Sequence, residues 1–194
     1  MDITFADISK ANKLKPKKGR ILLAEPFMID DHFSRSVIYL CEHNDDGSYG
    51  FILNNKLNLK LNEIITDREL PNVDVFYGGP VHATNLFFLH QLGDIINDSV
   101  KIDDNLWTGG DFNQICEFLN LGAISTSNIK FFLGYSGWSI DQLVDEIKST
   151  SWIVSEMIDE NLFVYNNNLW KEILVKKGGR YKAIANFPLN PDDN

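Results

Sequence analysis

The sequence predicts an α+β fold, and two observations carry that prediction. Segments with strand character outnumber segments with helical periodicity, and the helices are inserted singly instead of following every strand, which is not a repeating βαβ pattern. The stretch from Arg35 to Asn55 (RSVIYLCEHNDDGSYGFILNN) also reads as two alternating strands around a tight turn. Such a pair forms an antiparallel hairpin, so we expect antiparallel pairing in the sheet.

The elements before the hairpin are short. Ile3 and Ile8 are weak anchors for a short helix over Ile3–Asn12. The apolar run Arg20–Ala24 predicts a buried strand, which Pro26 ends. The polar residues between this strand and the hairpin predict a loop.

The hairpin follows as two strands joined by turn residues. Alternation over Val37–His43 predicts that its odd-numbered residues, Cys41 and His43 included, share one face, and that Glu42 lies on the other face with Ile38 and Leu40. The turn Asn44–Gly47 (NDDG) tolerates the positive φ that a hairpin needs. In the returning strand Tyr49–Asn54, Gly50 indicates a β-bulge or a close backbone approach.

The middle of the chain alternates short strands with two helices. Asp111 is the predicted N-cap of a helix that Gly122 closes. The other predicted elements are, in chain order, a short helix Leu61–Thr66, strands Val73–Tyr77 and Leu86–Leu92, one or two edge strands within Asp98–Trp107, and a strand Ile129–Gly134.

The last third contains the helix with the strongest signal. Ser139 and Gln142 form a capping box, so replacing Ser139 by Ala is expected to cost about 1 kcal/mol. Its apolar stripe has the spacing of a core face and consists of Ile140, Leu143, Val144 and Ile147. After it we expect a strand Trp152–Val154, a helix Leu169–Lys176 capped by Asn168, and an extended segment Arg180–Phe187.

Length, charge and cysteine usage limit the class of protein. A chain of 194 residues is expected to form one domain, here 19–188, between a lead-in at 1–18 and an acidic tail at 189–194. The net charge of −9 argues against direct nucleic-acid binding. Two cysteines without a disulfide framework suit a reducing cytoplasm, and no stretch approaches the roughly 20 apolar residues of a membrane helix.

Common chemical motifs are missing from the sequence. It has neither GxxxxGK[ST] nor GxGxxG, so no nucleotide cofactor is predicted. Cys41 and His43 are a Cys-x-His pair, but strong zinc sites need four ligands, so no metal is predicted. Cys41 shares a face with Val37 and Tyr39, which favours a buried, inert thiol. We therefore predict no catalytic residue, cofactor or metal ligand.

The candidate ligand-binding residues are polar groups at the ends of strands and glycines at one turn. The polar groups stand at the ends of the two hairpin strands and of one later strand, and the glycines follow the strand Val73–Tyr77. The candidates are Glu42, His43, Asn44, Asn54, Gly78, Gly79 and His90. Their structural alternatives stay open: His43 and Asn44 can simply hold the turn, and Gly78-Gly79-Pro80 can be a tight turn instead of an anion nest.

An ordered set of segments gives a family resemblance from Gly19 to Pro188. The segments are GRILLAEPF (Gly19–Phe27), FSRSVIYLCEHNDDGSYGFILN (Phe33–Asn54), GGPV (Gly78–Val81), FFLH (Phe87–His90), GGDF (Gly109–Phe112), LGYSGWSIDQL (Leu133–Leu143) and Trp152. In this order they resemble the YqgE/AlgH family of bacterial proteins. The resemblance implies an α+β fold with a bifurcated, barrel-like, mostly antiparallel sheet flanked by a few helices, in a cytoplasmic protein. This chain departs from many members after Asn54, where it has Asn55 and Lys56 instead of a basic residue and Pro.

The resemblance implies no agreed activity, cofactor or catalytic residue, although members are labelled transcriptional regulators. The leading hypothesis is a non-catalytic module that binds a protein partner or a small ligand and regulates indirectly. The alternative is a hydrolase or transferase with a site assembled from His43, Asn54, the Gly78-Gly79 turn and His90. Direct DNA regulation is a third hypothesis, and the net charge and the lack of a helix-turn-helix pattern argue against it.

Overall fold

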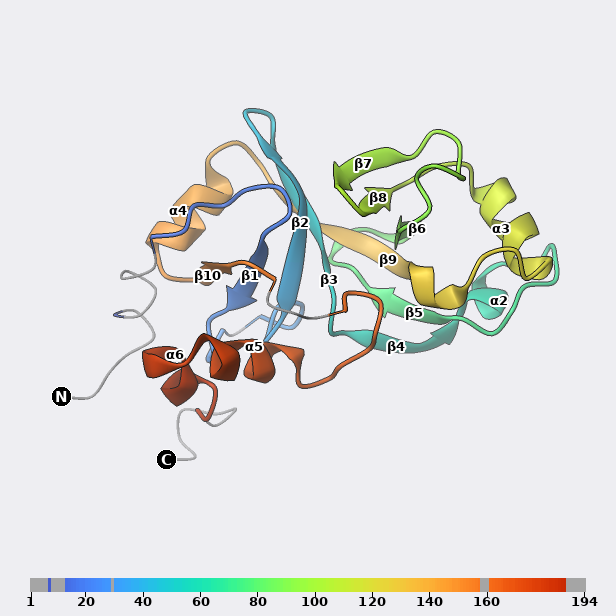
Figure 1. The fold of residues 1–194 in the computed structure, drawn as a ribbon. Coiled ribbons are helices and arrows are strands. Elements are labelled where there is room, and N and C mark those ends of the chain that lie inside the picture. The colour runs from blue at the N-terminus through green and yellow to red at the C-terminus, as the bar shows by residue number, and fades with distance from the viewer. Residues whose placement is uncertain (1–6, 8–12, 29, 158–160, 188–194) are drawn as a thin grey trace.

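The fold is a large, mostly antiparallel sheet with helices packed around it (Figure 1). The computed structural model describes residues 7, 13–28, 30–157 and 161–187. The strands are β1 (Ile21–Ala24), β2 (Val37–Asn44), β3 (Gly47–Ile52), β4 (Lys56–Lys60), β5 (Asp74–Tyr77), β6 (Val81–His90), β7 (Val100–Asp103), β8 (Leu106–Thr108), β9 (Ile129–Trp138) and β10 (Trp152–Ser155). The helices are α2 (Leu61–Ile64), α3 (Phe112–Asn120), α4 (Gln142–Lys148), α5 (Leu169–Lys177) and α6 (Gly179–Ile184), with a 3₁₀ turn η1 (Thr126–Asn128).

The strand order is β10-β1-β2-β3-β9-β6-β8-β7, with β4 and β5 on a side branch. Strand β9 creates the branch. Its first half pairs in parallel with β5, whereas its second half pairs with β3, and β6 runs along its other edge. The exchange of partners occurs where Gly78 donates its N–H to the Leu133 carbonyl and accepts from the Ile52 N–H. The predicted α+β class and the branched sheet are therefore present; closure into a barrel is not seen among the described strands.

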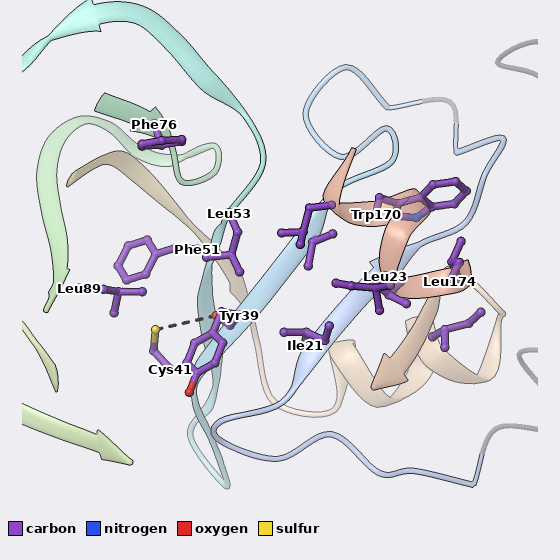
Figure 2. Close-up of a cluster of buried hydrophobic side chains, with 14 of the residues drawn as sticks. Ile21, Leu23, Tyr39, Cys41, Phe51, Leu53, Phe76, Leu89, Trp170 and Leu174 are labelled. Atoms are coloured by element: carbon purple, nitrogen blue, oxygen red, sulfur yellow. Dashed lines mark hydrogen bonds between the residues drawn. The ribbon is translucent and has the colours of Figure 1, made fainter. Parts of the chain in front are cut away.

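Two lobes flank the β2–β3 hairpin (Figure 1). In one lobe, α5 and α6 cover one face of the β1–β2 sheet and α4 covers the other, so the sheet is buried on both faces. The other lobe packs α2 and α3 against β5, β6 and β9 through Val75, Phe88 and Phe131. Figure 2 shows the first core, a cluster of buried side chains that includes Trp170 and Leu174 of α5 and Leu23 of β1 and extends to Phe76 and Leu89 of the other lobe.

A β-bulge places side chains of the hairpin on faces other than those that strict alternation predicts. The register between β2 and β3 shifts between Leu40 and Glu42, and Leu40 lies opposite Gly50. A Cβ on Gly50 would lie 2.2 Å from the Tyr39 carbonyl oxygen, so the backbones approach as the glycine indicated. The extra residue moves Glu42 to the face of Tyr39 and Tyr49, and His43 to the opposite face. The predicted faces of these two residues were therefore wrong.

Most predicted elements are confirmed, with corrections near glycines and at chain ends. Strand β9 continues through Gly134 to Trp138 because pairing with β3 and β6 satisfies its backbone. The segment predicted as extended at Arg180–Phe187 is mostly helix α6, since Gly178 and Gly179 take positive φ and start a second helix against α5. Strand β4 was not predicted, and β6 begins at Val81. The helix predicted over Ile3–Asn12, apart from Asp7, and the tail 189–194 lie outside the described residues.

The cap predicted for α4 was also partly wrong. The helix begins at Gln142, and Asp141 in the left-handed region precedes it. The Gln142 side chain accepts from the Ser139 N–H at 3.0 Å, but the Ser139 hydroxyl donates to Gln142 and caps no backbone N–H. Ile140 lies before the helix and is 61% exposed, so it is not part of the core face.

Candidate functional site

A cavity of about 680 Å³ lies beside the β2–β3 hairpin, toward the lobe of β6, β8 and β9. Its volume is within the range of small-molecule sites. Strands from distant parts of the sequence meet there because β9 pairs with β3 on one edge and with β6 on the other. The lining residues are Glu42, Asn44, Asp46, Gly47, Ser48, Tyr49, Phe51, Val81, Phe87, Thr108, Tyr135, Gly137 and Trp138.

Four aromatic rings form a closed set of contacts in the wall of this cavity. The Tyr49 centroid lies 6.2 Å from that of Phe51 and 5.9 Å from that of Tyr135. The Phe87 centroid lies 6.0 Å from that of Phe51 and 5.5 Å from that of Tyr135. The Tyr49–Tyr135 and Phe87–Tyr135 pairs meet edge to face, a favoured arrangement of aromatic pairs. These contacts fix the wall before any ligand arrives.

Backbone irregularities bring both sides of this wall into the cavity. The bulge in β2 places Glu42 opposite Tyr49. In β9, Gly134 has φ +68°, which breaks the alternation of the strand. Phe132 and Tyr135 therefore both pack against the first core. In a regular strand, residues three positions apart would point to opposite faces.

Polar groups of the cavity lie around the hairpin turn. The Asn44 amide donates to the Glu42 carboxylate at 2.7 Å, and its oxygen accepts from the Asp46 N–H at 2.8 Å. Thr108 is satisfied by the Phe88 carbonyl. Burial raises the pKa of Tyr49, so its hydroxyl keeps its proton at neutral pH. The turn thus presents carboxylates at the cavity, and the wall presents neutral phenol and phenyl groups.

His43 faces a second depression, on the other side of the hairpin. Its Nδ1 lies 2.7 Å from the Ser48 hydroxyl, across the turn. This depression has a volume of about 470 Å³ and lies against the start of α4, with Ser139 and Asp141 among its lining residues. Of the predicted site residues, Glu42 and Asn44 line the aromatic cavity, and His43 and Asn44 line this second depression.

Asn54 and the glycine pair have structural contacts outside both depressions. Asn54 accepts from the Val37 N–H at 2.9 Å and donates to the Arg35 carbonyl at 3.0 Å, which holds the start of β2. A Cβ on Gly78 would lie 2.2 Å from the Gly134 carbonyl oxygen, and one on Gly79 would lie 2.4 Å from backbone atoms of β9. The glycines permit the close approach at the branch of the sheet.

His90 lies in the core, apart from His43. Its side chain is fully buried, with Nε2 at 2.9 Å from the Gly109 carbonyl and Nδ1 accepting from the Leu92 N–H at 3.2 Å. Since Nδ1 accepts, Nε2 carries the proton and the ring is neutral. Burial lowers the pKa of His90, which favours the same state. The structure does not bring the two candidate histidines together at either depression.

The cysteines are buried, in agreement with the prediction for Cys41. Burial raises the pKa of the Cys41 thiol, which keeps it protonated. Within the described part of the chain, no group of three or more His, Cys, Asp or Glu side chains is arranged to hold a metal ion. Nor does any helix there combine the length and the apolar character needed to cross a membrane.

The sequence reasoning missed Lys130 and the aromatic wall. Lys130 lies in β9, is 3% exposed, and donates to the Leu53 and Leu162 carbonyls at 3.0 and 3.1 Å. Its Nζ lies 3.9 Å from the Phe76 ring centroid, and burial lowers its pKa to about 7. A single lysine within the apolar run IKFFL was the available signal. Phe87 and Tyr135 gave no comparable signal, because aromatic residues in strands are ordinary core residues.

Comparison with known proteins places the fold and the sequence in one family. The family model described as AlgH-like matches residues 21–182. The chain belongs to the AlgH-like family. A UPF0301 protein of Cytophaga hutchinsonii is 43% identical over 176 residues, covering 90% of this chain and 97% of that relative. A UPF0301 protein of Parabacteroides distasonis is 42% identical over 183 residues, covering 93% and 92%.

Solved structures support the same fold for this AlgH-like chain. The crystal structure of a Corynebacterium diphtheriae protein aligns with a TM-score of 0.76 at 19% identity, covering 96% of this chain and all of that one. The solution structure of the AlgH protein from Pseudomonas aeruginosa aligns with a TM-score of 0.71 at 24% identity, covering 90% and 98%. At these identities the likeness concerns the fold, so function has to be argued from the site.

Proposed function

We propose that this AlgH-like protein is a non-catalytic binding module that takes its ligand into the aromatic cavity. The observation that carries the proposal is the cavity itself, a volume of about 680 Å³ with aromatic walls and a few polar groups at one end. Sites for small organic groups have this composition, because the walls supply affinity and the polar groups supply orientation. The ligand is a small molecule or a side chain of a protein partner.

An effect on transcription would then be indirect. The chain carries a net charge of −9, and the described residues that line the cavity include Glu42 and Asp46 but no lysine or arginine. Carboxylates at this position repel a phosphate backbone, so DNA is not the ligand that the cavity favours. Regulation through a bound small molecule or a protein partner is compatible with the charge.

The hydrolase or transferase hypothesis receives no support from the contacts. His43 bonds Ser48 beside α4, while His90 is enclosed in the core and bonded to Gly109 and Leu92. Asn54 is occupied by two backbone groups. His43 and Ser48 are a base and a hydroxyl within hydrogen-bond reach, but Asn54 and His90, the other members of the hypothesised site, are held elsewhere. The site that the hypothesis needs is therefore not assembled from these candidates.

The test is an NMR titration with indole, a neutral aromatic probe. We expect indole to shift resonances of residues lining the cavity, among them Tyr49, Phe87 and Tyr135. Val81→Trp fills the cavity from β6 and should abolish these shifts. Val100→Trp is the matched control, because Val100 is 59% exposed on β7 outside the cavity.

The proposal fails if indole leaves the cavity resonances unchanged, or if the Val81→Trp protein binds indole as the wild type does. Thermal unfolding of both tryptophan variants establishes that they are folded before the titration. A loss of binding in Val81→Trp but not in Val100→Trp supports the cavity as the site.

A further inference from the structure

The charges that line the aromatic cavity all have one sign. Its acidic residues are Glu42 and Asp46, and no lysine or arginine is among the described residues that line it. None of the ion pairs between described side chains uses either carboxylate. Glu42 accepts from the neutral amide of Asn44 at 2.7 Å, a partner that brings no positive charge. The described lining of the cavity therefore presents negative charge.

The wall adds a second preference in the same direction. The faces of aromatic rings are negative, and they attract a cation within about 6 Å of the ring centroid. Tyr49, Phe87 and Tyr135 are partly exposed members of the four-ring wall, and their ring positions are fixed by contacts of 5.5 to 6.2 Å with their neighbours. A preformed wall receives such a group without paying to order its side chains.

We propose that the cavity selects an organic cation, with its ammonium group between the aromatic wall and the carboxylates of Glu42 and Asp46 and its apolar part along the rings. This inference rests on the proposed function and specifies the chemical class of its ligand. The ammonium group belongs either to a free small molecule or to a lysine side chain of a protein partner.

Other ligand classes fit the same residues less well. An anion would be repelled by two carboxylates and would find no lysine or arginine in the lining that the structure describes. A bare divalent ion needs several oxygen ligands at once, and within the described residues no group of three or more His, Cys, Asp or Glu side chains is arranged to hold one; it would also leave the aromatic rings unused. A neutral aromatic compound would use the wall but would leave the carboxylates unused. An organic cation is the class that uses both features.

The experiment compares choline with two isosteres of different charge, uncharged dimethylbutanol and anionic dimethylbutyrate. Affinities are measured by NMR titration of the whole chain at an ionic strength of about 0.15 M, where exposed charges more than about 8 Å apart are largely screened from each other. We expect choline to bind about tenfold more tightly than dimethylbutanol, and dimethylbutyrate to bind most weakly. A short peptide with one lysine, compared with its norleucine counterpart, then shows whether a protein side chain is also accepted.

Charge-neutralising variants locate the effect. In the double variant Glu42→Gln, Asp46→Asn, the choline affinity should fall about tenfold while the dimethylbutanol affinity stays the same. Asp45→Asn is the matched control, because Asp45 is on the same turn but lines the depression on the other side of the hairpin. It should leave both affinities within about twofold of wild type.

The outcomes separate this inference from the proposed function. If indole and dimethylbutanol bind in the cavity but neither choline nor the lysine peptide binds more tightly than its uncharged counterpart, the binding module stands and the cation preference is overturned. The same holds if Asp45→Asn weakens choline as much as the double variant does. If none of the probes shifts the cavity resonances, both proposals are overturned.

Discussion

The two halves of strand β9 lie in the same sheet but have different surroundings. The first half, Ile129–Leu133, has β5 on one edge and β6 on the other, and both of its faces are covered by core side chains. The second half, Gly134–Trp138, has β3 in place of β5, and Tyr135 and Gly137 line the aromatic cavity. The open face begins where β9 exchanges β5 for β3, so the change of partner that divides the sheet also marks the candidate site.

The two halves also differ in whether the charged groups beside them are buried or exposed to solvent. The first half buries the amine of Lys130 and satisfies it with two backbone carbonyls. The second half faces the carboxylates of Glu42 and Asp46, which stay exposed to water. A charge with access to solvent remains available to a ligand, whereas a buried one is neutralised or paired. The ionisable group buried most deeply in β9 is therefore structural, and the accessible carboxylates are the better ligand-binding candidates.

The largest expected effect comes from Gly134→Ala, at the junction between the halves. A Cβ there would lie 2.2 Å from the Gly79 carbonyl oxygen, and the backbone has φ +68°. We expect the free energy of unfolding to fall by about 4 kcal/mol, of which about 1 kcal/mol is backbone strain and the rest is the clash. Urea denaturation measures the loss.

Gly122→Ala is the matched control for this prediction. Gly122 has φ +64°, close to that of Gly134, but nothing lies within 4 Å of its Cβ position. It should cost only about 1 kcal/mol. Equal losses in the two variants would mean that the junction does not depend on the close approach of β9 and the Gly78-Gly79 turn.

The next effect is a dependence of stability on pH that arises from Lys130, in the first half of β9. Burial lowers its pKa to about 7, while in the unfolded chain it titrates near 10.4. Between these values the unfolded state binds more protons, so this group makes stability rise with pH from about 7 to about 10. The gain is at most about 1.4 kcal/mol per pH unit.

Lys130→Met removes that gain. We expect the free energy of unfolding of wild type minus that of Lys130→Met to increase as the pH is raised from 7 to 9.5, since the other titrating groups are common to both proteins. Part of the difference is independent of pH, because the Leu53 and Leu162 carbonyls lose their donor. Parallel stability curves for the two proteins would show that the Lys130 amine titrates normally.

A smaller effect is expected at the end of the second half of β9, where Trp138 forms a hydrogen bond with Glu146 of α4. The Glu146 carboxylate accepts from the indole N–H groups of Trp138 and Trp152, each at 2.8 Å. Glu146→Ala leaves both donors of these buried residues without this acceptor and should cost about 2 kcal/mol. Glu146→Gln retains an acceptor oxygen and should cost less, as measured by tryptophan fluorescence in urea. Equal costs for the two variants would contradict the role of the hydrogen bonds.

The sequence was sufficient for the regular parts of this fold and insufficient where alternation breaks. Apolar runs and turn residues located β1, β2, β5 and the hairpin turn, because burial and turn chemistry act locally. Glu42 and His43 were assigned to the wrong faces because one extra residue at the bulge reverses every later side chain. Gly50 indicated that a bulge was possible, but its position depends on how β2 pairs with β3.

The aromatic wall could not be predicted for a related reason. Tyr49, Phe87 and Tyr135 come from three strands, which the pairing of β9 with β3 and with β6 brings together. Tyr135 follows Gly134, whose positive φ redirects the side chains after it. The candidates predicted from the sequence were polar groups at strand ends and the Gly78-Gly79 pair, and of these only Glu42 and Asn44 are among the residues that line the cavity. Sites assembled from long-range strand pairing leave little local trace in a sequence.

The smallest expected effect is Ser139→Ala, just beyond the open half of β9. The sequence pattern alone predicts a cost of about 1 kcal/mol, because it makes Ser139 the N-cap of α4. In the structure its hydroxyl donates to the Gln142 side chain at 3.2 Å, and the bond that ties the two segments together is from the Ser139 backbone N–H, which alanine retains. We therefore expect a loss of no more than about 0.5 kcal/mol in urea denaturation, since the residue is exposed and no N–H loses its partner. Gln142→Ala, which removes the acceptor itself, should cost more than Ser139→Ala; the reverse order would restore the serine hydroxyl as the cap.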